Sequence, residues 1–180
     1  MGRMSRSSTV TVRQSPHGSA AVSGAMVVRA DTLEVETTER VQLVDVTSLL
    51  AQFIAGAGVQ EGVLSVWSLH TTCAVFINED QPALHADILR ALEQLIDRHT
   101  DWKHNDPAHS DCDRCNADAH LRAMLLGHSV TLQVSGGELV LGHWQRVLAA
   151  ELDGPRTRTL RLQAMGLAAP GNAGAGSAAL

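Results

Sequence analysis

The sequence lacks any long apolar segment. Hydrophobic residues make up 44% of its 180 positions, but none of their runs approaches the roughly 20 residues that a membrane-spanning helix requires. Met1–Ser23 also lacks the apolar stretch of a secretory signal. We therefore expect no membrane association and a cytoplasmic location.

Lysine is almost absent, since Lys103 is the only lysine among fourteen basic residues. The formal net charge is −5, and the arginines are dispersed singly along the chain. A nucleic-acid backbone is usually neutralised by a continuous basic stripe, which this sequence does not provide. We therefore expect no nucleic-acid partner, and most lysine chemistry is excluded.

The common catalytic fingerprints are also missing. The sequence contains no Gly-rich phosphate loop with its lysine, no dinucleotide-binding fingerprint and no serine-nucleophile elbow. The usual nucleotide-binding and serine-hydrolase classes therefore lose support.

Cysteine is scarce, and its three copies are an odd number that indicates a reducing compartment. Two of them belong to the run His109, Cys112, Cys115, which is similar to part of a zinc site. A fourth ligand is missing unless His104 supplies it. Exposed thiols in a loop are the alternative interpretation.

The apolar pattern predicts one strand-rich α+β domain with antiparallel or mixed sheets and two to three helices. We expect a domain over residues 24–166, a disordered extension or leader over 1–23 and a disordered Ala/Gly tail over 167–180. Strands are expected at Ala25–Glu36, Gly62–Leu69 and Cys73–Ile77, and in the segments SVTLQV, ELVL, WQRVLAAEL and TRTLRLQAM. Three helices are expected: one with Thr47 as its cap, one from Pro82 to about Arg98, and one at Ala117–Leu126.

Polar residues interrupt the apolar runs at two places. His70, Thr71 and Thr72 separate two strand-length runs, and Asn78 and Glu79 follow the second. Because unpaired polar groups destabilise a buried strand, these side chains must find partners around a site or within the core.

Histidines form a second set of candidates. His120 follows Asn116 by one helical turn, so both point to one face of the predicted helix. The polar segment His99–Asn116 is too long for an idle connection, and its His104 could fold onto that face. With His70, these imidazoles suit Zn²⁺ or another transition metal.

Arg156 and Arg158 follow a turn and stand two residues apart. In a strand they would project from one face, where paired guanidinium groups bind phosphate or carboxylate. The alternative is that they form ion pairs with Glu151, Asp153 or a neighbouring subunit.

Several motifs together resemble the YjbQ family: HTTCAVFINED, WKHN, NADAHLRAMLLGHS, SVTLQVSGGELVLGHWQRV and ELDGPRTR. The resemblance covers about Met26–Leu162 and is most specific over Ser129–Val147. One departure is His143, where the family usually has threonine. The resemblance implies a compact α+β trimer, with a secondary thiamine-phosphate synthase activity described for some members.

The resemblance also implies that the family's recurrent polar set forms one pocket, and from this and the patterns above we predict the role of each residue. The catalytic candidates are His70, Glu79, His104 and His120, and His70, His104 and His120 are also the metal candidates, for Mg²⁺ or Zn²⁺. The phosphate-binding candidates are Thr71, Thr72, Asn116, Gln145, Arg156 and Arg158, and Asp87 belongs to the same recurrent polar set.

The expected reaction joins a pyrimidine diphosphate to a thiazole phosphate with release of pyrophosphate, in a homotrimer. Two alternatives use the same residues. One is a non-enzymatic binder of a small phosphorylated metabolite or anion, and the other is a metal-dependent phosphoester hydrolase.

Overall fold

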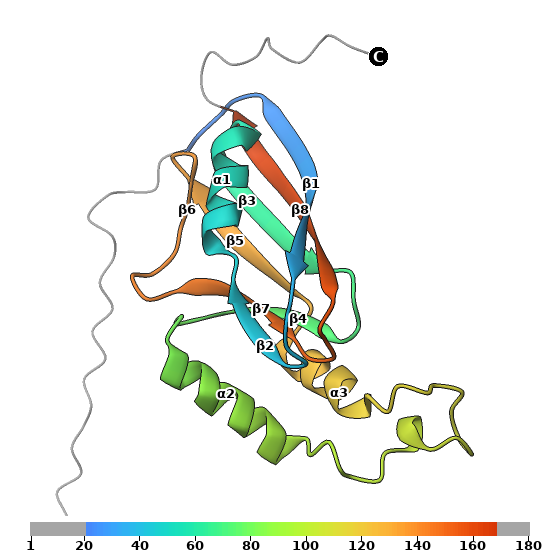
Figure 1. Ribbon diagram of the computed structural model, residues 1–180. Coiled ribbons are helices and arrows are strands. Elements are labelled where there is room, and N and C mark those ends of the chain that lie inside the picture. The colour runs from blue at the N-terminus through green and yellow to red at the C-terminus, as the bar shows by residue number, and fades with distance from the viewer. Residues whose placement is uncertain (1–20, 169–180) are drawn as a thin grey trace, which may run out of the picture.

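Two antiparallel sheets and three α-helices make up residues 21–168, the part of the chain that this computed structural model describes (Figure 1). The predicted N-terminal extension, up to residue 20, and the predicted tail from residue 169 lie outside the described residues. None of the described helices has the length and apolar character needed to cross a bilayer.

The larger sheet has the strand order β1-β8-β3-β5-β6. Its strands are β1 (Met26–Glu36), β3 (Val59–Ser68), β5 (Ser129–Ser135), β6 (Glu138–Leu139) and β8 (Thr157–Ala168). The smaller sheet has the order β2-β7-β4 and consists of β2 (Gln42–Asp45), β4 (Cys73–Asn78) and β7 (Arg146–Glu151). The α+β class and the strand-rich character are as the apolar pattern predicts.

The smaller sheet is buried on both faces. Alternate residues of β4 point to opposite sides, so Cys73 and Val75 join a core shared with the larger sheet, while Ala74 joins a second core. Helix α1 (Thr47–Ala57) adds Leu50 and Ile54 to the first core. The second core receives Leu92 and Ala123 from helices α2 (Pro82–Leu95) and α3 (Ala117–Leu126). The larger sheet, the smaller sheet and the pair of helices α2 and α3 therefore form three successive layers.

The start of α1 differs from the sequence expectation, which gave Thr47 as the cap of this helix. Thr47 is the first residue of α1, and Val46 precedes it without a side-chain cap. The Thr47 hydroxyl donates to Asp45 Oδ1 and accepts the Val147 amide at 2.8 Å, so it links α1 to β7. Helix α2 begins at Pro82, as predicted, and Gln81 accepts the Leu84 amide.

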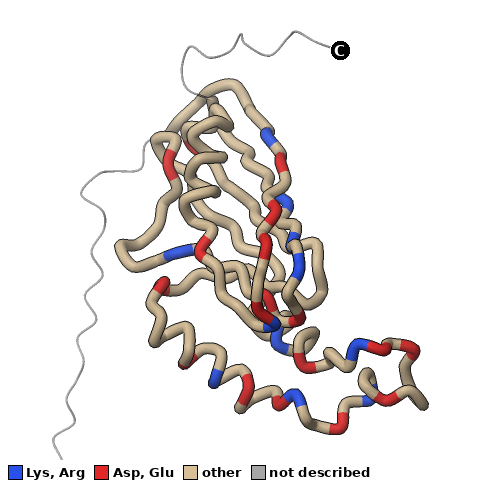
Figure 2. The backbone as a smooth tube through the Cα atoms, in the orientation of Figure 1, with Lys and Arg blue, Asp and Glu red and all other residues tan. Residues whose placement is uncertain are grey.

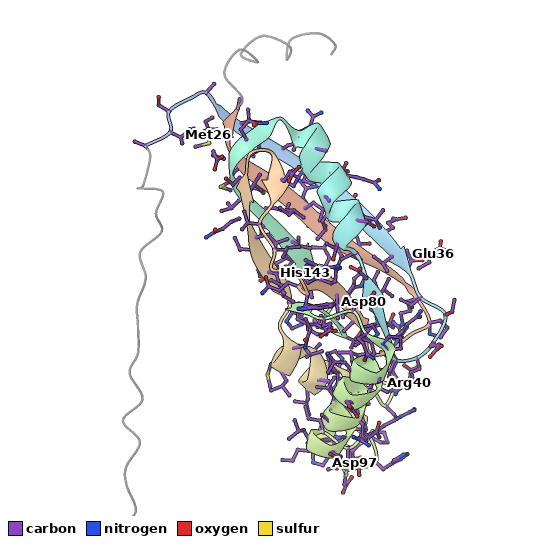
Figure 3. The ribbon with its side chains drawn as sticks, turned by 90° about the vertical axis from the view of Figure 1, so that its left-hand side faces the viewer. Met26, Glu36, Arg40, Asp80, Asp97 and His143 are labelled. Carbon is purple, nitrogen blue, oxygen red and sulfur yellow. The ribbon has the colours of Figure 1, made fainter. Side chains whose placement is uncertain are left out.

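Helix α2 ends at Leu95 rather than near Arg98, because Ile96 leaves the helical conformation. Among the described residues, the long polar segment between α2 and α3 contains only the short 3₁₀ helix η1 (Lys103–Asn105). Figure 3 labels Asp97 just beyond the end of α2, at the tip of the molecule opposite Met26. This segment returns the chain to the start of α3.

Two glycines allow β3 and β8 to pair closely near the end of the sheet. A Cβ on Gly62 would lie 2.2 Å from the Met165 carbonyl oxygen, and one on Gly166 would lie 2.2 Å from that of Glu61. The register shifts beside them, between Val59 and Glu61. Any side chain at either glycine would therefore force the two strands apart.

Candidate functional site

A pocket of about 460 Å³ opens where four segments meet: the β3–β4 turn, η1, the start of α3 and the β7–β8 turn. Figure 2 shows charged residues of both signs gathered around this end of the larger sheet. We call it the histidine–arginine pocket. Its lining includes eight of the predicted site residues, His70, Thr71, Thr72, His104, Asn116, His120, Arg156 and Arg158, together with Leu69, Cys112, Arg114 and Asp153.

Arg158 is held by a buried ion pair. Its Nε donates to Glu151 Oε2 at 2.6 Å, its Nη2 donates to Glu151 Oε1, and the same Nη2 donates to Thr72 Oγ1 at 3.0 Å. Burial acts to lower the pKa of Arg158, but the hydrogen bonds and charge of Glu151 outweigh it and raise the pKa. The ion-pair interpretation therefore describes Arg158, whose Nε and Nη2 are used by Glu151 and Thr72, while its Nη1 has no partner among residues 21–168.

Glu151 is fully paired as well. Besides Arg158, it accepts the Thr37 hydroxyl at 3.0 Å and the Asp153 amide at 2.8 Å. A Cβ on Gly154 would lie 2.7 Å from the Glu151 side chain, so only glycine fits beside it. Thr37 follows β1, and Thr72, which Arg158 contacts, precedes β4. The β7–β8 turn is therefore held against the ends of both strands.

Asp153 connects the other polar groups of the pocket. It accepts the Asn116 side-chain amide at 2.8 Å and Arg156 Nη2 at 2.9 Å. Arg114 and Arg40 approach it at 3.8 Å. Arg156 is partly exposed and Arg114 is about half exposed. Arg156 also donates its Nε to the Asp153 carbonyl at 2.9 Å, so it is held at Asp153. Arg114, with its longer contact, can turn toward a bound anion.

His70 is fixed in one tautomer by the backbone. Its Nε2 accepts the Thr159 amide at 2.9 Å, so in the neutral ring the proton resides on Nδ1. Burial and the charge of Arg158 lower the pKa of His70, against the opposite effect of Glu151. His70 is thus a neutral imidazole with one N–H left to donate.

His104 and His120 form an edge-to-face pair, with ring centroids 5.1 Å apart and planes at 85°. Burial and then the neighbouring His104 lower the pKa of His120, although Asp153 and Asp118 act to raise it. A neutral imidazole near pH 7 can accept a proton from a ligand or donate one to it. His120 is therefore one proton-exchanging group of the pocket, and the His104 ring packs against it.

Glu79, Gln145 and Asp87 lie elsewhere. Cys73 begins β4 beside the pocket, but Glu79 follows the other end of that strand, about 17 Å away at 3.3 Å per residue. Asn78 pairs with Arg146 there, so Glu79 and Gln145 share the far end of the smaller sheet. Gln145 accepts the Gly142 amide, and Asp87 pairs with the exposed Arg90. The structure does not bring these three predicted residues to the pocket.

The histidines do not fit a three-imidazole metal centre. The Nε2 lone pair of His70 is occupied by the Thr159 amide, and within residues 21–168 no three His, Cys, Asp or Glu side chains are grouped so as to hold an ion. The side chains of the zinc-like run His109, Cys112 and Cys115 also have separate partners. His109 pairs with Asp106 at 2.8 Å, Cys112 contacts the Asn116 side chain, and the exposed Cys115 contacts the Asn105 carbonyl.

Sequence reasoning missed Asn105 and Arg114, and it named Asp153 only as a possible ion-pair partner of the two arginines. Asn105 Oδ1 accepts the first amide of α3, from Ala117, at 3.0 Å, and so attaches η1 to that helix. Asp153 and Arg114 join the lining. Asn105 belongs to the WKHN motif and Asp153 to ELDGPRTR, so the motifs marked the right segments without revealing these contacts.

The fold and the pocket define a class: a small two-sheet α+β protein with three histidines and partly exposed arginines in one pocket. The model of the family described as UPF0047 protein YjbQ-like matches residues 31–167. The chain therefore belongs to the YjbQ family.

Relatives and solved structures agree with this assignment. A UPF0047 protein of Methanothermobacter thermautotrophicus is 40% identical over 141 residues, which cover 78% of this chain and 94% of the relative. The UPF0047 protein YugU of Bacillus subtilis is 33% identical and covers 75% of this chain and 98% of its own. A YbjQ-like protein of unknown function from Sulfolobus solfataricus has a similar structure, with a TM-score of 0.74, 34% identity, and coverage of 79% and 99%.

Proposed function

We propose that the histidine–arginine pocket binds the phosphate groups of a small metabolite and transfers a pyrimidinylmethyl group from its diphosphate to a thiazole phosphate. The observation that supports this proposal is the meeting of Arg114 and Arg156, both partly exposed, with three imidazoles in one pocket. Guanidinium groups and imidazole N–H groups are suitable donors to phosphate oxygens. The three free cysteines are compatible with the proposed cytoplasmic location.

In this reaction the bond between the methylene carbon and the diphosphate oxygen breaks, and a new bond forms between that carbon and the thiazole nitrogen. The bonding electrons leave with the diphosphate, which departs as pyrophosphate. Arg114 and Arg156 would stabilise the negative charge that develops on the leaving oxygens. His70 Nδ1–H would donate to the same oxygens without changing its own charge.

His120 would take up a proton during the transfer. Because the pKa of His120 is lowered, it is mostly neutral near pH 7 and can accept a proton from an incoming phosphate ligand that still carries one. Protonated, it would add a positive charge beside the leaving group. Mg²⁺ would enter the pocket bound to the diphosphate, because it prefers oxygen ligands and keeps several of its waters.

The test measures thiamine phosphate formed from the two substrates with purified protein and Mg²⁺. We expect turnover by the wild type, and a fall in kcat/KM of at least about tenfold in Arg156→Met, from the loss of a charge-assisted contact. Arg90→Met is the matched control, since this arginine lies exposed on α2 and should leave turnover unchanged.

Two other outcomes would replace the proposal. Binding of pyrophosphate by calorimetry without turnover would indicate a non-enzymatic binder of phosphorylated metabolites. Release of inorganic phosphate from a panel of phosphoesters, without formation of thiamine phosphate, would indicate a hydrolase.

A further inference from the structure

A second cavity lies directly beside the histidine–arginine pocket. Its volume is about 370 Å³, and its lining residues are Trp102, Lys103, His104, Ala117, His120 and Leu121. We call it the tryptophan cavity. His104 and His120 line both spaces, so the imidazole pair forms the boundary between them.

The two spaces differ in chemistry. The histidine–arginine pocket presents arginines, Asp153 and an amide, whereas the tryptophan cavity presents an indole, a leucine and an alanine. Its one permanent charge is that of Lys103, whose exposed ammonium group can stay in water while its aliphatic stem lines the wall. A ligand that filled both spaces would therefore be charged at one end and apolar at the other.

Trp102 is held in place before any ligand arrives. Its indole Nε1 donates to the Asp97 carbonyl at 2.9 Å, and its own carbonyl accepts the Asn105 amide at 2.9 Å. Asn105 in turn accepts the Ala117 amide of α3. Because the indole N–H is already paired, the ring offers its apolar surface to the cavity rather than a hydrogen bond.

We propose that the tryptophan cavity takes the planar aromatic part of the phosphorylated ligand, with the phosphate held in the histidine–arginine pocket. The substrate class is then a phosphate or diphosphate ester of an aromatic or heteroaromatic methanol. The indole and the two imidazoles supply three aromatic partners for a planar ring, in stacked or edge-to-face arrangements. This inference rests on the proposed function of the neighbouring pocket.

The arrangement also fixes where the ester linkage lies. A ligand that occupies both spaces must pass His104 and His120, so its linkage between ring-bearing carbon and phosphate oxygen lies beside the imidazole pair. His120 then lies where it can exchange a proton with the leaving oxygen. The tryptophan cavity would thus select the substrate and place its reacting bond.

The test compares the affinities of two probes, benzyl phosphate and methyl phosphate, measured by calorimetry. We expect the wild type to bind benzyl phosphate at least about tenfold more tightly than methyl phosphate, from aromatic packing and apolar burial. In Trp102→Ala this preference should disappear, while the affinity for methyl phosphate stays as in the wild type. Trp144→Ala is the matched control, because Trp144 is exposed and lines neither space.

Leu121→Asn provides a second variant that changes the cavity wall without touching the Trp102 hydrogen bonds, and it should also lose the preference for benzyl phosphate. Equal binding of both probes by the wild type would overturn this inference alone and leave the phosphate-binding proposal intact. If the wild type bound neither these probes nor pyrophosphate, both proposals would fall.

Discussion

At the scale of single residues, the site is built from side chains whose charge and tautomer are set by their neighbours. His70 is the clearest case, because a backbone amide occupies its Nε2 and the positive Arg158 disfavours a second proton. The buried pair of Arg158 and Glu151 adds rigidity, since removal of either partner would leave the other charge buried and alone.

The first prediction concerns the pH dependence of stability at His70. Its pKa in the folded protein lies below the ordinary value of 6.5, so the unfolded chain binds more protons in this range. This contribution is fully present above pH 6.5 and is lost as the pH falls through the folded-state pKa. Urea unfolding should show this decline between about pH 7.5 and about pH 5, the range in which histidines usually titrate. The substitution His70→Gln should make the decline shallower.

Glutamine is the appropriate replacement because its amide oxygen can reach the Thr159 amide as Nε2 does, without titrating. His70→Ala leaves that amide without its partner and should be destabilised by about 1–3 kcal/mol at neutral pH. An unchanged pH profile in His70→Gln, or a nitrogen NMR signal showing the proton on Nε2, would contradict the assignment.

At the scale of elements, the helix pair is joined by an arginine. Arg122 of α3 donates twice to the Ile96 carbonyl at the end of α2, at 3.1 and 2.7 Å, and lies 3.5 Å from the buried Asp118. Asp118 in turn lies 3.5 Å from Arg40, in the β1–β2 connection, which Figure 3 labels near the helices. The buried Asp118 carboxylate therefore joins α3 to the β1–β2 connection, and Arg122 joins α3 to α2.

The second prediction follows from that bridge. Arg122→Met should destabilise the fold by about 3 kcal/mol, since it removes two charge-assisted hydrogen bonds and one partner of a buried carboxylate. Hydrogen exchange should accelerate most at the C-terminal turn of α2. Arg90→Met, on an exposed ion pair of the same helix, is the control and should cost less than about 0.5 kcal/mol. Equal effects of the two substitutions would show that the bridge carries no stability.

At the scale of the whole molecule, one face of the larger sheet is left uncovered within residues 21–168. Val28, Met165 and Val63 lie side by side across β1, β8 and β3. Val28 and Met165 are 60% and 39% exposed, and Trp67 nearby on β3 is 53% exposed. The same face also carries Gln163 and Arg161 of β8, so it is a partly apolar sheet face, which is a suitable surface for self-association.

The third prediction is that the protein is a homotrimer, as its family resemblance implies, assembled through this face. Light scattering at micromolar concentration should give three times the chain mass of 19.2 kDa. Trp67→Glu should shift the protein toward monomer, because it would bury a charge in the apolar interface. Leu95→Glu, at a more exposed apolar position on the end of α2, should remain a trimer. A monomeric wild type would refute the assembly, and a trimeric Trp67→Glu would place the interface elsewhere.

The sequence alone was sufficient for the local structure and for the main candidates of the site. Alternation and helical spacing predict most strands and all three α-helices, because these patterns depend only on neighbouring residues. The one-turn spacing of Asn116 and His120 predicts their shared face, and both line the pocket. The short β2 was missed, since four residues carry too little periodicity to be recognised.

What only the tertiary structure decided is which polar groups pair with one another. Glu79 and His70 both end apolar runs in the sequence, but the antiparallel register of β4 and β7 takes Glu79 to the far end of the smaller sheet. Arg156 and Arg158 look equivalent, yet Arg158 points into the core onto Glu151, whereas Arg156 stays partly exposed at Asp153. The physical reason is that hydrogen-bond partners are chosen by strand register and by the direction of each side chain, which long-range packing sets and local sequence does not encode.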